Sequence, residues 1–193
     1  MILLTGSMCI PVYAAEYWPE GPEVVSPNVI VMEASTGTVL YDRDSLEAHY
    51  PASITKIMTT LIALENSDLN DIVTFSDAAI DNTEGSGIAR DYGEQMTMEQ
   101  CLYAVMLASA NECAYAVAEH VGGTIENFVA MMNEKAKELG MNDTNFVNCH
   151  GLDEDDHLTS AYDIALMSRE LLTKHPQITN YTTIWTDSLR DGK

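Results

Sequence analysis

The stretch ITKIMTTLIALE, residues 54–65, constrains the fold of this chain most. On a helical wheel of 100° per residue, its apolar residues leave almost no purely polar face; they stand at positions 54, 57, 58, 61, 62 and 64. A helix that is apolar all round must be surrounded by protein, so we predict a central, buried helix after Pro51. With 46% hydrophobic residues in 193, the chain can supply the rest of a sizeable core.

The charge balance excludes one class of partner. Nine Lys and Arg residues stand against 30 Asp and Glu, which gives a formal net charge of −21. Nucleic-acid binding needs clustered cations, so we expect no nucleic-acid partner. Anionic membrane surfaces should repel the chain for the same reason, so membrane attachment is expected only through an anchor outside it.

Local patterns predict the other elements. Residues 28–43 should form a β-hairpin that turns near Gly37. Residues 66–95, rich in Asp, Asn, Gly and Ser, should be loops with short pieces of structure. Four further helices are expected: 97–109 with a capping box from Thr97 and Gln100, 112–123, 124–139 with a stop at Gly140, and 160–176 with a stop at Pro176.

The two ends of the chain carry separate signals. Residues 181–186 contain strong strand formers, and Asp191-Gly192 favours a tight turn, so we predict a strand whose return strand is missing; the alternative is a frayed terminal loop. Residues 1–14 carry no Asp, Glu, Lys or Arg and are predicted to be a partial signal peptide cleaved after Ala14, the alternative being a buried first strand. This leader predicts an extracytoplasmic location.

Cysteine usage points to no metal or disulfide framework. Without Cys9 the chain keeps Cys101, Cys113 and Cys149, an odd number with no C-x-x-C pair. His150 beside Cys149 is a weak candidate for a dyad, because adjacent residues in an extended segment point to opposite sides. The acidic run at 153–157 lacks the alternating ligands of a calcium loop. We therefore expect neither a metal nor a cofactor.

Lys56 and Ser53 form the first candidate catalytic pair. Lys56 is the only Lys or Arg between Arg43 and Arg90, and it lies inside the most apolar predicted helix. Burial lowers the pKa of an amine, which can then accept a proton near neutral pH. Ser53 lies three residues earlier, within reach of that amine, as a nucleophile with its base. S-x-x-K alone is common, and the structural alternative is a helix cap with a surface lysine.

Ser109-Ala110-Asn111 interrupts an otherwise continuous apolar helical run. Ser and Asn compete for backbone hydrogen bonds, so we predict a break that exposes their polar groups between two helices. The hydroxyl could relay a proton and the amide could hold a substrate peptide. A plain helix–helix turn is the alternative for this tripeptide considered alone.

Three segments together resemble the serine D-alanyl-D-alanine carboxypeptidases, low-molecular-mass penicillin-binding proteins of peptidase family S11. PASITKIMTT (51–60) looks like the family's nucleophile motif, ASANECA (108–114) like its S-x-N motif, and residues 148–171 like the stretch that follows. The resemblance implies an α+β fold of the serine β-lactamase and DD-peptidase (transpeptidase-like) type, with a helical cluster packed on an antiparallel sheet.

The resemblance also implies roles and partners. Carried over residue by residue, Ser53 is the acyl-ester nucleophile, Lys56 the general base, Ser109 a proton relay and Asn111 a substrate-binding residue. The implied substrates are peptidoglycan stem peptides that end in D-Ala-D-Ala, cleaved outside the cytoplasm during cell-wall remodelling. β-Lactam antibiotics are the implied acylating inhibitors.

The family's third motif, K-T-G, which grips the substrate carboxylate, is absent; only Lys193 stands near the end. We therefore expect residues 15–193 to be an incomplete catalytic domain that lacks the last sheet strands, which puts the activity of this exact polypeptide in question. Two alternatives stay open. A class A β-lactamase would need a deacylating glutamate, and Glu138 with Asn142 straddles the helix stop at Gly140. A non-catalytic penicillin-binding scaffold or pseudoenzyme fragment is the other.

Overall fold

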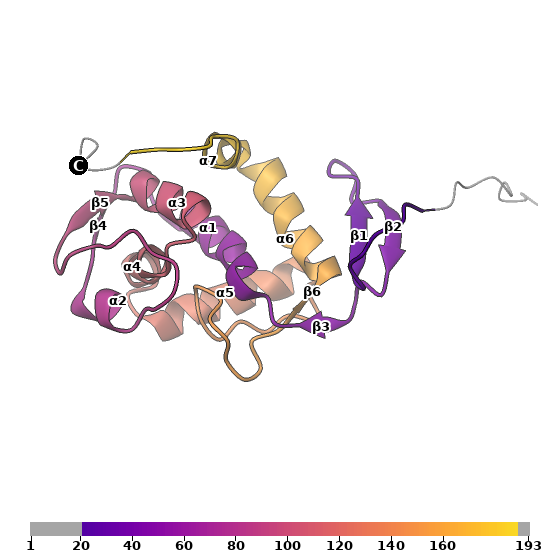
Figure 1. Ribbon diagram of the computed structural model, residues 1–193, viewed down its shortest axis with the longest axis horizontal. Coiled ribbons are helices and arrows are strands. Elements are labelled where there is room, and N and C mark those ends of the chain that lie inside the picture. Colours follow the sequence, from indigo (N-terminus) through magenta and orange to yellow (C-terminus); the bar gives the residue numbers. More distant parts are fainter. Residues whose placement is uncertain (1–20, 189–193) are drawn as a thin grey trace, which may run out of the picture.

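The computed structural model describes residues 21–188, which fold into a helical cluster with small β-sheets at its edges (Figure 1). The elements in chain order are β1 (Val29–Met32), β2 (Val39–Arg43), β3 (Ala48–His49), a 3₁₀ turn (Ala52–Ile54), α1 (Thr55–Asn66), β4 (Ile72–Thr74), α2 (Asp77–Asp81), β5 (Gln95–Thr97), α3 (Met98–Leu107), α4 (Asn111–Gly122), α5 (Ile125–Leu139), β6 (Thr159–Ser160), α6 (Ala161–Lys174), a second 3₁₀ turn (Pro176–Ile178) and α7 (Thr179–Thr182).

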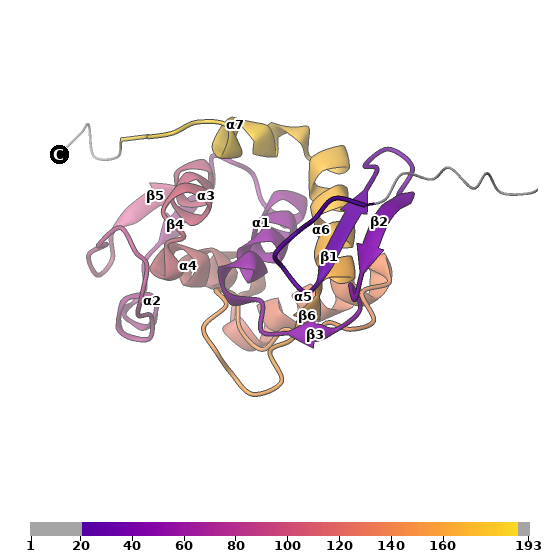
Figure 2. The same cartoon turned by 45° about the vertical axis from the view of Figure 1, so that its right-hand side comes forward.

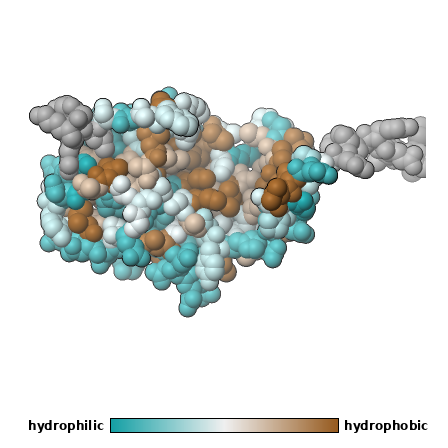
Figure 3. Space-filling model, in the orientation of Figure 1, coloured by the Kyte–Doolittle hydropathy of each residue, from teal (hydrophilic) through white to brown (hydrophobic). Residues whose placement is uncertain are grey.

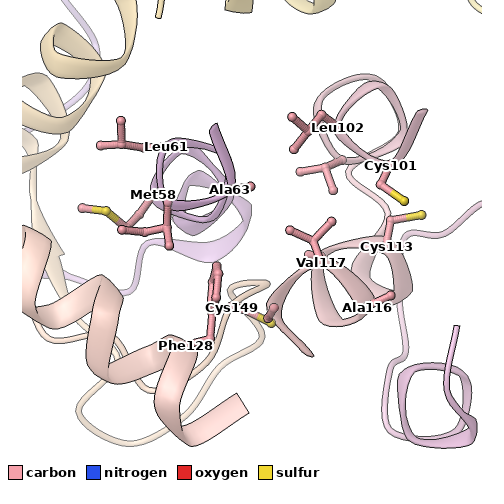
Figure 4. Packing of buried hydrophobic residues seen from close by; sticks show 14 of the residues in the cluster. Met58, Leu61, Ala63, Cys101, Leu102, Cys113, Ala116, Val117, Phe128 and Cys149 are labelled. Carbon is pink, nitrogen blue, oxygen red and sulfur yellow. The ribbon is translucent and has the colours of Figure 1, made fainter. Parts of the chain in front are cut away.

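Helix α1 is the central, buried helix that its sequence predicts. It packs against α3, α4, α5 and α6, and Met58, Leu61 and Ala63 are completely buried. In the close view, Met58 of α1 lies near Phe128 of α5, while Val117 of α4 points toward α3, the helix that carries Leu102 (Figure 4). Truncation of one such side chain to alanine typically costs about 2–5 kcal/mol, so this packing fixes the position of α1 firmly.

The predicted helix ends are confirmed in atomic detail. At the start of α3, the N–H of Gln100 donates to Oγ1 of Thr97 over 3.2 Å, and the N–H of Thr97 donates to Oε1 of Gln100 over 2.9 Å. This reciprocal pair is the predicted capping box. Helix α5 ends at Gly140, which adopts the left-handed conformation at φ +78°.

The sheets are antiparallel pairs, so the predicted α+β class is confirmed. Strands β1 and β2 form the predicted hairpin, with Val29 opposite Arg43 and Val31 opposite Tyr41. In the described part of the chain, β3 pairs with β6 and β4 with β5, each as a separate two-stranded sheet. Both ribbon views place the hairpin beside α6 (Figures 1 and 2), and the guanidinium of Arg169 holds it there by donating to the carbonyl of Ala34 over 2.7 Å.

The surface is mostly polar, as the acidic composition predicts. Figure 3 shows brown apolar patches among teal residues on this face. Some of the exposed apolar side chains belong to the hairpin, where Val31 and Leu40 are each 44% exposed. Ile54, next to Ser53, is 42% exposed. No helix within residues 21–188 is long and apolar enough to cross a bilayer.

The predicted strand at 181–186 is wrong. Thr179–Thr182 forms the short helix α7, which continues the 3₁₀ turn begun at Pro176, and no regular element follows up to residue 188. A strand needs a hydrogen-bonding partner, and no described strand lies beside this segment. Tyr181 instead buries its ring edge-on against Tyr103 of α3, with the centroids 4.6 Å apart. The predicted leader, 1–14, and the predicted turn at Asp191-Gly192 lie outside the described residues.

Candidate active site

Ser53 and Lys56 meet where the first 3₁₀ turn runs directly into α1. The amine Nζ of Lys56 lies 3.2 Å from Oγ of Ser53. Ser53 is exposed to solvent, whereas Lys56 is only 2% exposed. Ala52, just before the nucleophile candidate, holds φ at +48°, a left-handed conformation that costs a non-glycine residue about 1–2 kcal/mol. The predicted pair is therefore assembled on a strained turn, with one partner open and the other enclosed.

The Lys56 amine has two further partners besides Ser53. Nζ donates to Oδ1 of Asn111 and to the carbonyl oxygen of His150, both over 2.7 Å. An ammonium group carries three protons and a neutral amine carries two. A neutral Lys56 can thus satisfy both 2.7 Å acceptors and turn its lone pair toward Ser53.

Burial favours that neutral form. The loss of hydration lowers the pKa of Lys56 from 10.5 to about 8, although the acidic groups of Cys149 and Glu112 act in the opposite direction. A pKa of about 8 leaves roughly a tenth of the amine neutral at pH 7. Lys56 is therefore suited to accept a proton at physiological pH, which a surface lysine is not.

Ser109 lies in the predicted break between α3 and α4, but the predicted exposure of its polar groups is wrong: Oγ of Ser109 is buried and Asn111 is only 5% exposed. The backbone of Ser109 adopts φ +55°, and its Oγ is buried without a hydrogen-bond partner among residues 21–188. It lines a cavity of about 330 Å³ together with Ser53 and Lys56. The structure brings Ser109 into the space next to the pair but not into a hydrogen bond with it.

Asn111, the first residue of α4, links the Lys56 amine to a neighbouring loop. Besides accepting from Lys56, its amide Nδ2 donates to the carbonyl of Glu84 over 2.5 Å. Asn111 also lines a cavity of about 300 Å³; the other lining residues are Ala52, Ser53, Gly85, Ser86, His150, Gly151, Leu152 and Asp153. Ser53 therefore faces two adjoining cavities, and the four predicted site residues surround them.

Residues 148–157, called the brace below, hydrogen-bond to α1 beside the site. Sequence reasoning missed this contact. Oγ1 of Thr59 donates to the carbonyl of Cys149 over 2.6 Å. The ring of His157 accepts from the N–H of Val147 at Nδ1 over 2.9 Å, so its Nε2 carries the proton that bonds Oγ1 of Thr55 over 2.8 Å. Thr55 and Thr59, one turn apart in a mostly apolar helix, are the signal that could have indicated this contact.

Gly151 packs against the backbone of the turn that carries Ser53. It has φ +90°, and a Cβ built on it would lie 1.8 Å from the carbonyl oxygen of Ala52. Only glycine fits there.

The cysteine alternative receives no support from the geometry. Burial raises the pKa of the Cys149 thiol to about 12, which suits a structural thiol and not a nucleophile. Among the described residues, no group of three or more His, Cys, Asp or Glu side chains could hold a metal ion.

Comparison with known proteins matches this arrangement to one family. The sequence model described as D-alanyl-D-alanine carboxypeptidase, Peptidase S11, covers residues 15–191. The chain is 43% identical over 170 residues to D-alanyl-D-alanine carboxypeptidase DacF of Bacillus subtilis, which covers 86% of this chain and 43% of DacF. With DacC of Escherichia coli it shares 33% identity over 175 residues, 86% of this chain and 44% of DacC.

Solved structures agree. Penicillin-binding protein 6B of Escherichia coli superimposes with a TM-score of 0.84 at 27% identity, over 91% of this chain and 58% of that one. D-alanyl-D-alanine carboxypeptidase DacD of Francisella tularensis gives a TM-score of 0.81 at 30% identity, over 85% and 41% of the two chains. The chain spans less than half the length of DacF and of DacC. On the match over residues 15–191, the chain belongs to the D-alanyl-D-alanine carboxypeptidase family, Peptidase S11.

Proposed function

We propose that residues 15–193 carry the nucleophile-bearing part of a serine-type D-Ala-D-Ala carboxypeptidase, which removes the terminal D-alanine from peptidoglycan stem peptides. One observation carries the proposal: a buried lysine with a lowered pKa lies 3.2 Å from an exposed serine hydroxyl. Two acceptors hold the lysine in place, so its lone pair has one direction left, toward Ser53.

In the proposed reaction, Oγ of Ser53 attacks the carbonyl carbon of the penultimate D-alanine while its proton passes to Nζ of Lys56. The C–N bond of the tetrahedral intermediate then breaks. Nζ of Lys56 returns its extra proton through the hydroxyl of Ser109 to the leaving nitrogen; that hydroxyl is buried in the cavity next to Ser53 and has no competing partner within the described residues. Water hydrolyses the acyl ester and restores Ser53.

Asn111 has a double role in this proposal. Its carbonyl oxygen orients the Lys56 amine, and it lines the cavity where the substrate peptide would lie. The substrate's terminal carboxylate needs a cationic partner, and the family's K-T-G motif is not in these 193 residues. The proposed activity of the whole protein therefore includes a carboxylate-binding group from outside them.

A β-lactamase-like function has less support. The glutamate that sequence spacing nominated, Glu138, lies on α5 and pairs with Lys135 over 2.8 Å, with 65% of its side chain exposed. Neither cavity at Ser53 is lined by Glu138. Deacylation by that residue is therefore disfavoured, and β-lactams are proposed as acylating inhibitors of this protein.

The test is incubation of the protein with an acyl-D-Ala-D-Ala peptide and, separately, with penicillin. The proposal expects released D-alanine and a long-lived penicilloyl adduct, both lost in Ser53→Ala. Rapid catalytic opening of penicillin without an adduct would show a β-lactamase. A stable adduct without D-alanine release by the full-length protein would show a binding scaffold.

We further propose that the protein works outside the cytoplasm. The uncharged stretch 1–14 supports export, and the proposed peptidoglycan substrate of the protein lies outside the cytoplasm. N-terminal sequencing of the exported protein should begin at Ala15. An intact leader on protein recovered from the cytoplasm would contradict the proposal.

A further inference from the structure

One wall of the cavity at Ser53 is a thin loop, residues 84–88, with the sequence Glu-Gly-Ser-Gly-Ile. Gly85 and Ser86 line the cavity of about 300 Å³ that also contains Ser53. The same two residues line a second cavity, of about 340 Å³, on which Glu112 also borders. Residues 85–86 of the loop thus have open space on two sides, so side-chain packing does little to hold them, whereas Ile88 is half-buried against the hydrophobic core.

Hydrogen bonds also hold the loop: Nη2 of Arg90 donates to the carbonyl of Ile88 over 2.9 Å, and the other three involve the first two residues of α4. The N–H of Asn111 donates to the carbonyl of Ser86 over 2.8 Å, and its side chain donates to the carbonyl of Glu84. The third bond comes from Glu112, whose Oε1 accepts from the N–H of Ile88 over 2.6 Å. A hydrogen bond to an ionised carboxylate is about twice as strong as a neutral one.

Glu112 is unusual for an acidic residue in a chain with 30 of them, because it is only 7% exposed. Its place in the first turn of α4 favours a negative charge there. A buried carboxylate without hydrogen-bond partners would destabilise the fold. Glu112 does not line either cavity at Ser53, so it acts there through the loop and not by touching the substrate.

We propose that Glu112 is a positioning residue: by holding the N–H of Ile88, it fixes the 84–88 loop as a wall of the Ser53 cleft. This inference rests on the proposed function of Ser53. Loss of the bond should loosen the wall, lower the rate of Ser53 acylation and leave the Ser53 and Lys56 pair itself intact.

Gly87 offers an independent way to disrupt the hydrogen bond between Glu112 and Ile88. A Cβ built on it would lie 2.6 Å from Oε2 and 2.9 Å from Oε1 of Glu112, closer than real Cβ atoms approach. Glycine at this position therefore lets the carboxylate sit against the loop backbone. Gly87→Ala should displace the Glu112 carboxylate without altering the carboxylate itself.

A competing explanation is that Glu112 acts by its charge on Lys56, whose pKa it raises. Glu112→Gln separates the two roles, since glutamine keeps an acceptor oxygen for Ile88 and removes the charge. Positioning predicts that Gln rescues what Ala loses. A charge effect predicts that Gln and Ala behave alike and both shift the pH profile of acylation.

The experiment measures amide hydrogen exchange at Ile88 and the rate of acylation by fluorescent penicillin in wild type, Glu112→Ala, Glu112→Gln and Gly87→Ala. The matched control is Glu119→Ala, on the same helix, where Oε2 of Glu119 accepts from Oγ of Ser76 over 2.6 Å, away from the Ser53 cavities. We expect exchange at Ile88 to rise about tenfold or more in Glu112→Ala and Gly87→Ala, with a parallel fall in acylation.

Glu112→Gln should stay within a few fold of wild type on both measures, and Glu119→Ala should not change exchange at Ile88. Unchanged exchange in Glu112→Ala, or a Gln variant as impaired as Ala, would overturn the inference. If Glu112→Ala does not fold, Gly87→Ala and Glu112→Gln decide by the same criteria. A wild type that is never acylated would refute the proposed function, while the exchange arm would still decide whether Glu112 holds the loop.

Discussion

At the scale of single residues, burial of the Lys56 amine lowers both its pKa and the stability of the fold at neutral pH. A folded-state pKa of about 8 against 10.5 for a free lysine means that unfolding takes up a proton between these values. Stability therefore rises with pH across that window, and below it the buried amine costs on the order of 3 kcal/mol. The spacing of Ser53 and Lys56 could be predicted from sequence because it is local. The partners of Lys56 at Asn111 and His150 could not, because they are 55 and 94 residues away.

The lowered pKa of Lys56 predicts a pH profile for acylation of Ser53. Only the neutral amine can accept the serine proton, so the rate should rise about tenfold per pH unit below pH 8 and level off above it. The measurement is the second-order rate constant for penicillin acylation between pH 6 and 9.5. A profile that falls with pH over this range would contradict the base assignment.

At the scale of elements, the segment 148–157 and α1 act as one unit. Thr55, Lys56 and Thr59 of α1 bond to His157, His150 and Cys149 in that order. Sequence patterns predicted α1, the α3 capping box and the α5 stop because each depends on neighbours in the chain. The brace and the position of the 84–88 loop could not be predicted, because they depend on contacts between distant segments. The strand predicted at 181–186 is absent for a related reason: residues with strand propensity form a strand only beside a hydrogen-bonding partner.

Gly151→Ala tests how closely residues 148–157 fix the turn that carries Ser53. The new Cβ would meet the carbonyl of Ala52 at 1.8 Å, and φ +90° disfavours any side chain, so we expect the free energy of unfolding to fall by about 3 kcal/mol or more. Penicillin acylation should fall with it. Gly140→Ala is the control, because it shares a positive φ but has open space around it and should cost only about 1 kcal/mol. Equal costs in urea unfolding would contradict the close approach.

His150 gives the brace a pH dependence on the acid side. Burial, and then the charges of Lys56 and His157, lower its pKa from 6.5 to about 4. The unfolded chain binds more protons between these values, so stability should be lost as pH falls from 6.5 toward 4, by up to about 1.4 kcal/mol per pH unit. Urea unfolding at several pH values should show a shallower loss in His150→Gln. The same slope in both proteins would exclude His150 as a source.

At the scale of the whole molecule, the acidic chain builds a helical core around α1, in which the buried amine of Lys56 lies beside the exposed Ser53. The 30 carboxylates exceed the nine Lys and Arg residues by 21, which disfavours polyanionic partners, and Lys56 is the cation that bonds Ser53. Family membership follows from the match over residues 15–191, and the geometry explains why the three segments in 51–60, 108–114 and 148–171 occur together. They converge from α1, the α3–α4 break and the brace on one serine.

The measurement that tests this account most directly is the mass of the penicillin adduct and its place in the chain. Trypsin cleavage after Arg43 and Lys56 gives a peptide, residues 44–56, that contains Ser53 and the buried Ser45. Fragment ions should place the adduct on Ser53. Ser53→Ala and Lys56→Arg should carry none, because guanidinium cannot give up its proton, while Ser45→Ala should be labelled. An adduct on another residue, or an undiminished adduct in Lys56→Arg, would contradict the account.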